Sequence, residues 1–127
     1  MRLISAKDLA VYQKAYELAM RVFVLSQNFP PEERYALTSQ LRRASRSVCL
    51  NLREAWAKRR YEAHFVSKLT DCDGENSETD SALDFARDCK YIGEVDHSEL
   101  TAISRAIGKM LGQMIKDPSG FLISSSS

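Results

Sequence analysis

The stretch TDCDGENSETD, residues 70–80, is the densest group of potential metal ligands in the sequence. It holds five acidic residues, a cysteine and an Asp-Gly pair, which together suggest a calcium-binding loop. A helix–loop–helix calcium site needs glycine at the sixth position of a D-x-D-x-D-G pattern, followed by a glutamate. Gly74 comes too early for this pattern, and no glutamate stands at the required place. We therefore predict no metal site in this stretch.

The sequence does not contain the combination of residue types and spacings that a catalytic site needs. Glu94 and His97 make an E-x-x-H pair, but a di-iron bundle needs two such pairs and two further inward glutamates. No spacing joins one of the three cysteines to a histidine as a nucleophile and its base. We predict no catalytic residue, no cofactor and no metal. The alternative is a small-molecule or metal-binding bundle, conceivably an enzyme.

Four arginines recur on one face of a predicted helix at spacings of 4, 7 and 7: Arg42, Arg46, Arg53 and Arg60. Three interpretations are open for this face. It is solvated or ion-paired within the chain, it pairs with an acidic helix of a neighbouring subunit, or it binds the phosphates of nucleic acid. Guanidinium groups suit phosphate because they present paired hydrogen-bond donors.

A second polar set lies on another face of the same segment at spacings of 7, 4 and 3: Gln40, Ser47, Asn51 and Glu54. We interpret it as a hydrogen-bonded network that fixes the register of the helices. A ligand site or a pore lining is the functional alternative.

The distribution of charge separates the two central quarters of the chain. Residues 31–60 carry eight basic and three acidic residues, which gives +5, and residues 61–90 carry three basic and eight acidic residues, which gives −5. The first 30 residues contribute +2 and residues 91–127 contribute −1, so the whole chain has a net charge of +1. The total therefore favours no particular partner, whereas the asymmetry indicates two opposite surfaces.

Helical periodicity predicts the elements that position these residues. Four segments follow, at about 8–28, 31–59, 62–90 and 98–116, and no alternating strand pattern competes with them. A single helix over residues 37–90 would be about 81 Å long, so we expect a break near residues 58–62. The predicted fold is an all-α, antiparallel up-down-up-down four-helix bundle. It forms one domain over residues 1–127, with a disordered tail after about residue 118.

Two apolar patterns give testable orientations. The third segment has a seam at helical spacing that runs through the acidic stretch: Phe65, Leu69, Cys72, Asn76, Thr79, Leu83 and Ala86. The first segment has two adjacent stripes, which is more than a monomeric surface helix needs. We expect the second stripe to pack between subunits: Val11, Ala15, Leu18, Val22 and Leu25.

Localisation follows from what the chain lacks. No signal peptide opens the sequence, and charged residues interrupt every apolar run before transmembrane length. We expect a cytoplasmic protein with reduced thiols and no membrane partner.

Three stretches resemble a known family: DLAVYQKAYELA, FPPEERYALTSQLRRA and NLREA. They are similar to motifs of the four-helix bundle proteins encoded in intervening sequences of bacterial 23S rRNA genes. The matching positions are Asp8, Leu9, Tyr12, Gln13, Phe29, Pro30, Leu37, Thr38, Gln40, Leu41, Arg43, Ala44, Asn51 and Glu54. Gly74 stands where that family usually has a glycine, whereas Ala55 replaces one and residues 72–75 are unusually acidic.

The resemblance implies a bundle that assembles into rings, typically homopentamers. It is also similar to the accessory protein of diversity-generating retroelements, a pentameric barrel that binds nucleic acid and a reverse transcriptase. From the resemblance we expect a non-catalytic scaffold or adaptor, with nucleic acid as a candidate partner.

Overall fold

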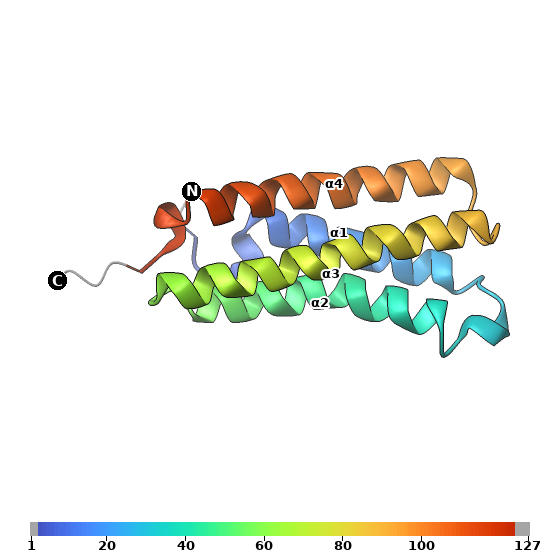
Figure 1. Cartoon of the computed structure of the whole chain (residues 1–127), viewed down its shortest axis with the longest axis horizontal. Helices are drawn as coiled ribbons and strands as arrows, with labels where there is room; N and C mark the ends of the chain where they lie inside the picture. The colour runs from blue at the N-terminus through green and yellow to red at the C-terminus, as the bar shows by residue number, and fades with distance from the viewer. Residues whose placement is uncertain (1–2, 124–127) are drawn as a thin grey trace.

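The computed structural model describes residues 3–123, and every long element in it is a helix (Figure 1). The α-helices are α1 (Ala10–Ser26), α2 (Leu37–Ala57), α3 (Glu62–Asp88) and α4 (Glu94–Lys116). Three short 3-10 turns accompany them: η1 (Ala6–Asp8), η2 (Pro31–Glu33) and η3 (Ser119–Phe121). Residues 3–123 contain no strand.

The helices run antiparallel in sequence order and occupy the corners of a square. Each of α1 and α3 packs against both α2 and α4, as Figure 1 shows. This arrangement confirms the predicted up-down-up-down bundle. The break between the second and third segments also lies where the length argument placed it, since α2 ends at Ala57 and α3 begins at Glu62.

The turn between α3 and α4 is set by Lys90, three residues before Gly93. Lys90 has a φ of 65°, in the left-handed region that favours glycine. The N–H of Tyr91 bonds the carbonyl of Ala86 at 2.8 Å and that of Lys90 bonds the carbonyl of Arg87 at 2.9 Å, which is a Schellman ending. Gly93 instead precedes the first residue of α4.

The predicted seam of α3 is confirmed at all seven positions, each of which is buried (Phe65, Leu69, Cys72, Asn76, Thr79, Leu83, Ala86). The acidic stretch is therefore helical throughout. Gly74 lies in its middle and causes no break, since the core on the opposite side holds the helix in place.

The seam of α3 also makes a polar contact with α4. The Asn76 side chain donates to the carbonyl of Ser104 at 2.8 Å, and the Ser104 hydroxyl lies 3.2 Å from the Asn76 amide oxygen. A Cβ atom at Gly108 would lie 3.6 Å from the Asn76 amide nitrogen. That distance is ordinary van der Waals contact, so the spacing of α3 and α4 does not require a glycine at Gly108, and Gly112 faces open space.

The predicted role of the second α1 stripe is wrong. Val11, Ala15, Leu18 and Val22 are all buried within their own bundle. The apolar side chains that α1 leaves exposed are Tyr16, Met20 and Val24. Two stripes in sequence do not tell which one turns inward, because that is set by packing against α2 and α4.

The described part of the tail differs from the expected disorder. Residues 119–121 form η3, and the ring centroid of Phe121 lies 6.4 Å from that of Phe65. The N–H of Ile123 donates to the carbonyl of Arg59 at 3.2 Å. A partly buried aromatic ring thus anchors this segment to the end of the bundle, and the last four residues, 124–127, lie outside the described part.

Replacing Leu83 with Ala tests the seam. We expect this change to lower the free energy of unfolding by about 2–5 kcal/mol, because it leaves a cavity in the centre of the bundle. The matched control is Ser81→Ala, an exposed position two residues away, which should change it by less than about 0.5 kcal/mol. Urea denaturation of both variants measures the difference. Equal effects would contradict the orientation of α3.

Candidate functional site

The cations of α2 fall into two sets on either side of its buried stripe. Arg43 faces α3, where its guanidinium lies 2.9 and 3.0 Å from the two carboxylate oxygens of Glu78 and 3.5 Å from Glu75. These carboxylates hold the pKa of Arg43 above its ordinary value. Arg43 is therefore already neutralised within the chain.

The predicted polar set also faces α3, but as two separate clusters. Gln40 donates to Glu78 at 3.3 Å, near one end of α2. Toward the other end, the ammonium of Lys68 lies 2.6 Å from Glu54 and donates to Asn51 at 3.2 Å.

Within this set the only direct contact is from Asn51 to the backbone carbonyl of Ser47, at 3.0 Å. The predicted network is thus replaced by contacts from α2 to α3 at two levels. Such contacts fix the register of the two helices.

The second set of cations lies on the side of α2 that faces α1. The guanidinium carbon of Arg42 lies 4.9 Å from the ring centroid of Phe23, and that of Arg46 lies 5.8 Å from it. Arg42 also donates through Nε to the hydroxyl of Ser26 at 2.7 Å. A ring face attracts a cation, so Phe23 holds both guanidinium groups at the surface without neutralising them.

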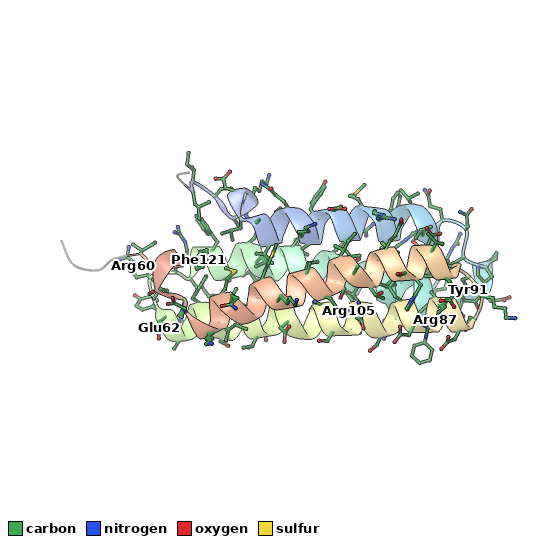
Figure 2. All side chains as sticks on the ribbon, turned by 90° about the horizontal axis from the view of Figure 1, so that it is seen from above. Arg60, Glu62, Arg87, Tyr91, Arg105 and Phe121 are labelled. Atoms are coloured by element: carbon green, nitrogen blue, oxygen red, sulfur yellow. The ribbon has the colours of Figure 1, made fainter. Side chains whose placement is uncertain are left out.

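Arg53 continues this face, and Arg60 does not. Arg53 stands seven residues after Arg46, two helical turns along α2, so helical spacing places it on the same side of the helix. Arg60 lies beyond the last residue of α2, in the turn before α3, at the end of the bundle labelled in Figure 2. We name Arg42, Arg46 and Arg53 the arginine face.

The arginine face has no anionic partner in the part of the chain that the structure describes. No carboxylate lies within 4.0 Å of its three guanidinium groups or of Arg60. A groove of about 450 Å³ opens along it, lined by Arg34, Tyr35, Thr38, Ser39, Arg42, Arg43, Arg46, Ser47 and Leu50. No acidic side chain lines this groove.

The outer side of α3 has the opposite charge. Asp73 and Asp80 have no cation within 4.0 Å among the described residues. Between Asp71 and Asp88 the helix carries seven acidic residues and one basic residue, Arg87. The predicted opposite surfaces therefore exist as the arginine face of α2 and an acidic face on α3.

The E-x-x-H pair does not form a metal centre. Glu94 is exposed at the start of α4, whereas His97 is buried against α3. The Nε2 atom of His97 lies 2.7 Å from Asp84, and its Nδ1 atom lies 3.5 Å from the guanidinium of Arg87. Within residues 3–123, no group of three or more His, Cys, Asp or Glu is placed to hold a metal ion.

One pocket at an end of the bundle is lined mainly by apolar side chains. It encloses about 490 Å³ between the start of α1 and the end of α4, and Gln113 and Asp117 are its polar side chains. It contains no pair of titratable groups that could exchange a proton. It is therefore a weak candidate for catalysis.

No described helix combines the length and the apolar character needed to cross a membrane.

The comparisons with known proteins agree with this architecture. Residues 7–113 match the family described as 23S rRNA-intervening sequence protein. The chain belongs to this family. A crystal structure from Bacteroides thetaiotaomicron, of a protein with unknown function from the S23 ribosomal protein family, is 28% identical to the chain with a TM-score of 0.76. The similarity covers 84% of this chain and 99% of the other. No curated protein matches the chain.

Sequence reasoning grouped four arginines that have no carboxylate within 4.0 Å among the described residues, but it left open whether this face is ion-paired within the chain. Arg43 stands three residues after Gln40 and four before Ser47, so helical spacing places it with the polar set that meets α3. The placement of Arg43 could therefore be predicted from the sequence. The contact of Arg42 and Arg46 with Phe23 could not be predicted, because it depends on how α1 is rotated against α2.

The reactivity of the thiols tests the burial of the core. Burial raises the pKa of Cys49 to about 11 and that of Cys72 to about 12, while Cys89 is exposed. Only the thiolate is reactive, so a disulfide reagent at pH 8 should label Cys89 rapidly in the folded protein and all three thiols in denaturant. A Cys89→Ser variant that still labels rapidly when folded would contradict the assignment.

Proposed function

We propose that the protein is a non-catalytic scaffold or adaptor whose working form is a homo-oligomer of this chain. The pentameric ring is the size that the family resemblance implies. The observation that carries the proposal is the pair of unneutralised surfaces described above. Among residues 3–123, the arginine face has no carboxylate within 4.0 Å, and Asp73 and Asp80 on α3 have no cation within that distance.

Exposed apolar side chains support self-association as well. Tyr16, Met20 and Val24 follow one another at four-residue spacing along the outer side of α1. Leu50 on α2 and Phe85 on α3 are also exposed. Large apolar side chains gathered on a surface are typical of contact sites between proteins.

Opposite charges on different faces favour head-to-tail contacts. In such a contact one face of a subunit meets a different face of the next, and a ring forms when the rotation closes. A scaffold of this kind needs no catalytic group. Its function would lie in presenting several copies of one surface.

Light scattering tests the assembly. At low salt and micromolar concentration we expect a mass several times the 14.4 kDa of one chain. The mass should fall as salt is raised to about 1 M, where the screening length is about 3 Å, because charged contacts between subunits are then weakened. A monomer under the low-salt condition would overturn the proposal.

Nucleic acid is a second candidate partner, favoured by one observation. Phe23 holds Arg42 and Arg46 at the surface, and Arg42 uses only Nε internally, on Ser26. The N–H groups of a guanidinium form a planar fork that matches the oxygens of a phosphate. The net charge of +1 means that any such binding depends on this local patch.

The double substitution Arg42→Ala with Arg46→Ala tests this second candidate. It should abolish retention on single-stranded nucleic acid, because about two phosphate contacts are lost. The control is Arg43→Ala, which removes a guanidinium that is already paired with Glu78. Equal retention of both variants would contradict the role of the arginine face. Absence of wild-type binding at low salt would remove nucleic acid and leave the scaffold.

A further inference from the structure

We propose that the corner between the end of α1 and the start of α2 is a binding pocket for a single phosphate group. The pocket lies at the end of the bundle away from both termini, where the chain crosses from α1 to α2 through η2 (Figure 1). It encloses about 260 Å³ and is lined by Ser26, Gln27, Phe29, Pro30, Pro31, Arg34, Thr38 and Arg42. The site does not depend on the self-assembly proposed above.

Two guanidinium groups give the pocket a positive charge. Arg34 and Arg42 both line it, and among residues 3–123 neither has a carboxylate within 4.0 Å. Neither of the two glutamates just before Arg34 lines the pocket. Glu33 is engaged elsewhere, since its carboxylate accepts from the N–H of Leu37 at 3.2 Å and from the hydroxyl of Tyr91 at 2.8 Å. An anion in the pocket would therefore meet two unneutralised cations.

A buried hydroxyl without a partner points to a ligand at this place. Thr38 is 8% exposed, and its Oγ1 is the one buried side-chain nitrogen or oxygen among residues 3–123 that has no hydrogen-bond partner. Such a group is unfavourable because it has lost its bond to water and gained none in return. Thr38 lines both this pocket and the adjoining groove on α2. A phosphate oxygen in the pocket would accept the proton of this hydroxyl.

Contacts within the chain hold the pocket in shape. The Ser26 hydroxyl donates to the carbonyl of Phe23 at 3.1 Å and accepts from Nε of Arg42 at 2.7 Å. This leaves the two terminal nitrogens of Arg42 for another acceptor. Phe29 is buried, with its ring centroid 5.4 Å from that of Tyr91, and the two prolines that follow it restrict the backbone. A site that is already ordered binds its ligand with less loss of conformational entropy.

The size and the donors of the pocket favour one phosphate group. Pockets for drug-sized ligands enclose about 300–1,000 Å³, so a volume of about 260 Å³ suits one small group and not a whole nucleotide. A guanidinium binds phosphate oxygens through paired N–H donors. The groove on α2 shares Arg34, Thr38 and Arg42 with the pocket, so the rest of a larger phosphate compound would lie in that groove.

Titration calorimetry with inorganic phosphate at constant ionic strength tests the pocket. We expect saturable binding at millimolar concentration or below. Arg34→Ala and Thr38→Val should each weaken this binding about tenfold or more, which is the effect of losing one hydrogen bond to a charged group. The matched control is Arg53→Ala, which removes the same charge eleven residues beyond Arg42, about 16 Å along α2, and should leave the affinity unchanged.

Urea denaturation separates ligand binding from a purely structural role of Thr38. Because Thr38→Val removes an unpaired buried hydroxyl, the variant should be at least as stable as the wild type. Its weaker phosphate binding then reflects the lost hydroxyl and not unfolding. Unchanged phosphate affinity in both Thr38→Val and Arg34→Ala would contradict the assignment of the pocket.

A fluorescent single-stranded oligonucleotide, with and without a 5′-phosphate, identifies the source of the group. Binding that is at least about tenfold tighter with the 5′-phosphate would assign the pocket to the end of a nucleic acid. Equal binding of the two, together with saturation by inorganic phosphate, would assign it to a free phosphate compound. The pocket is overturned if inorganic phosphate does not saturate and the 5′-phosphate gives no preference. An equal loss of affinity in Arg53→Ala would also overturn it, because the attraction would then belong to the arginine face as a whole.

Discussion

The pairing of α2 with α3 is the constraint on which the other surfaces depend. The centre of the α3 seam holds Asn76 and Thr79 where a larger apolar residue would bury more surface. Asn76 is satisfied across the bundle by Ser104 of α4, and Thr79 is satisfied within α3 by the carbonyl of Glu75 at 2.9 Å. The buried polar groups of the seam are therefore hydrogen-bonded, but the seam gives less hydrophobic stabilisation than a run of leucines would. Ion pairs between α2 and α3 add specificity for one alignment of the two helices. Exposed pairs contribute only about 0–1 kcal/mol each, so their main effect is to select one register.

That register decides which charges remain for other molecules. Arg43 meets Glu75 and Glu78, and Lys68 meets Glu54, so these groups are used within the chain. The cations one position away on the helix, Arg42 among them, turn toward α1 and meet an aromatic ring. A rotation of α2 about its own axis would change which of its cations meet α3 and which meet α1. The surface that we propose as a contact site is thus a consequence of how the core pairs, and not an independent feature of the sequence.

The sequence could predict what depends on helical spacing alone. The seam of α3, the break before Glu62 and the bundle itself are of this kind, because burial on a helix repeats at a period that the residues display. The rotation of α1 was mispredicted, since two adjacent apolar stripes present the same periodicity. The left-handed conformation of Lys90 was missed because lysine is not a residue type that favours it. The anchoring of Phe121 on Phe65 joins residues far apart in the chain, and such contacts leave no local signal. Within the site, the same limit separates Arg43, which spacing could assign, from the Phe23 contact, which it could not.

The separation of charge also bears on the symmetry of any assembly. A two-fold dimer brings the same patch of both subunits together. Through α2 it would place two arginine faces against each other, and through α3 it would place Asp73 and Asp80 against their own copies. Like charges brought together across an interface oppose association.

Contact between the basic face of one copy and the acidic face of another is attractive, and it neutralises groups that no part of the described chain neutralises. A near-neutral chain with two strongly charged sides therefore favours a partner with the same two sides, arranged head to tail, over a uniformly anionic partner. Nucleic acid would satisfy the arginines and leave the acidic side of α3 repelled, whereas a second copy satisfies both.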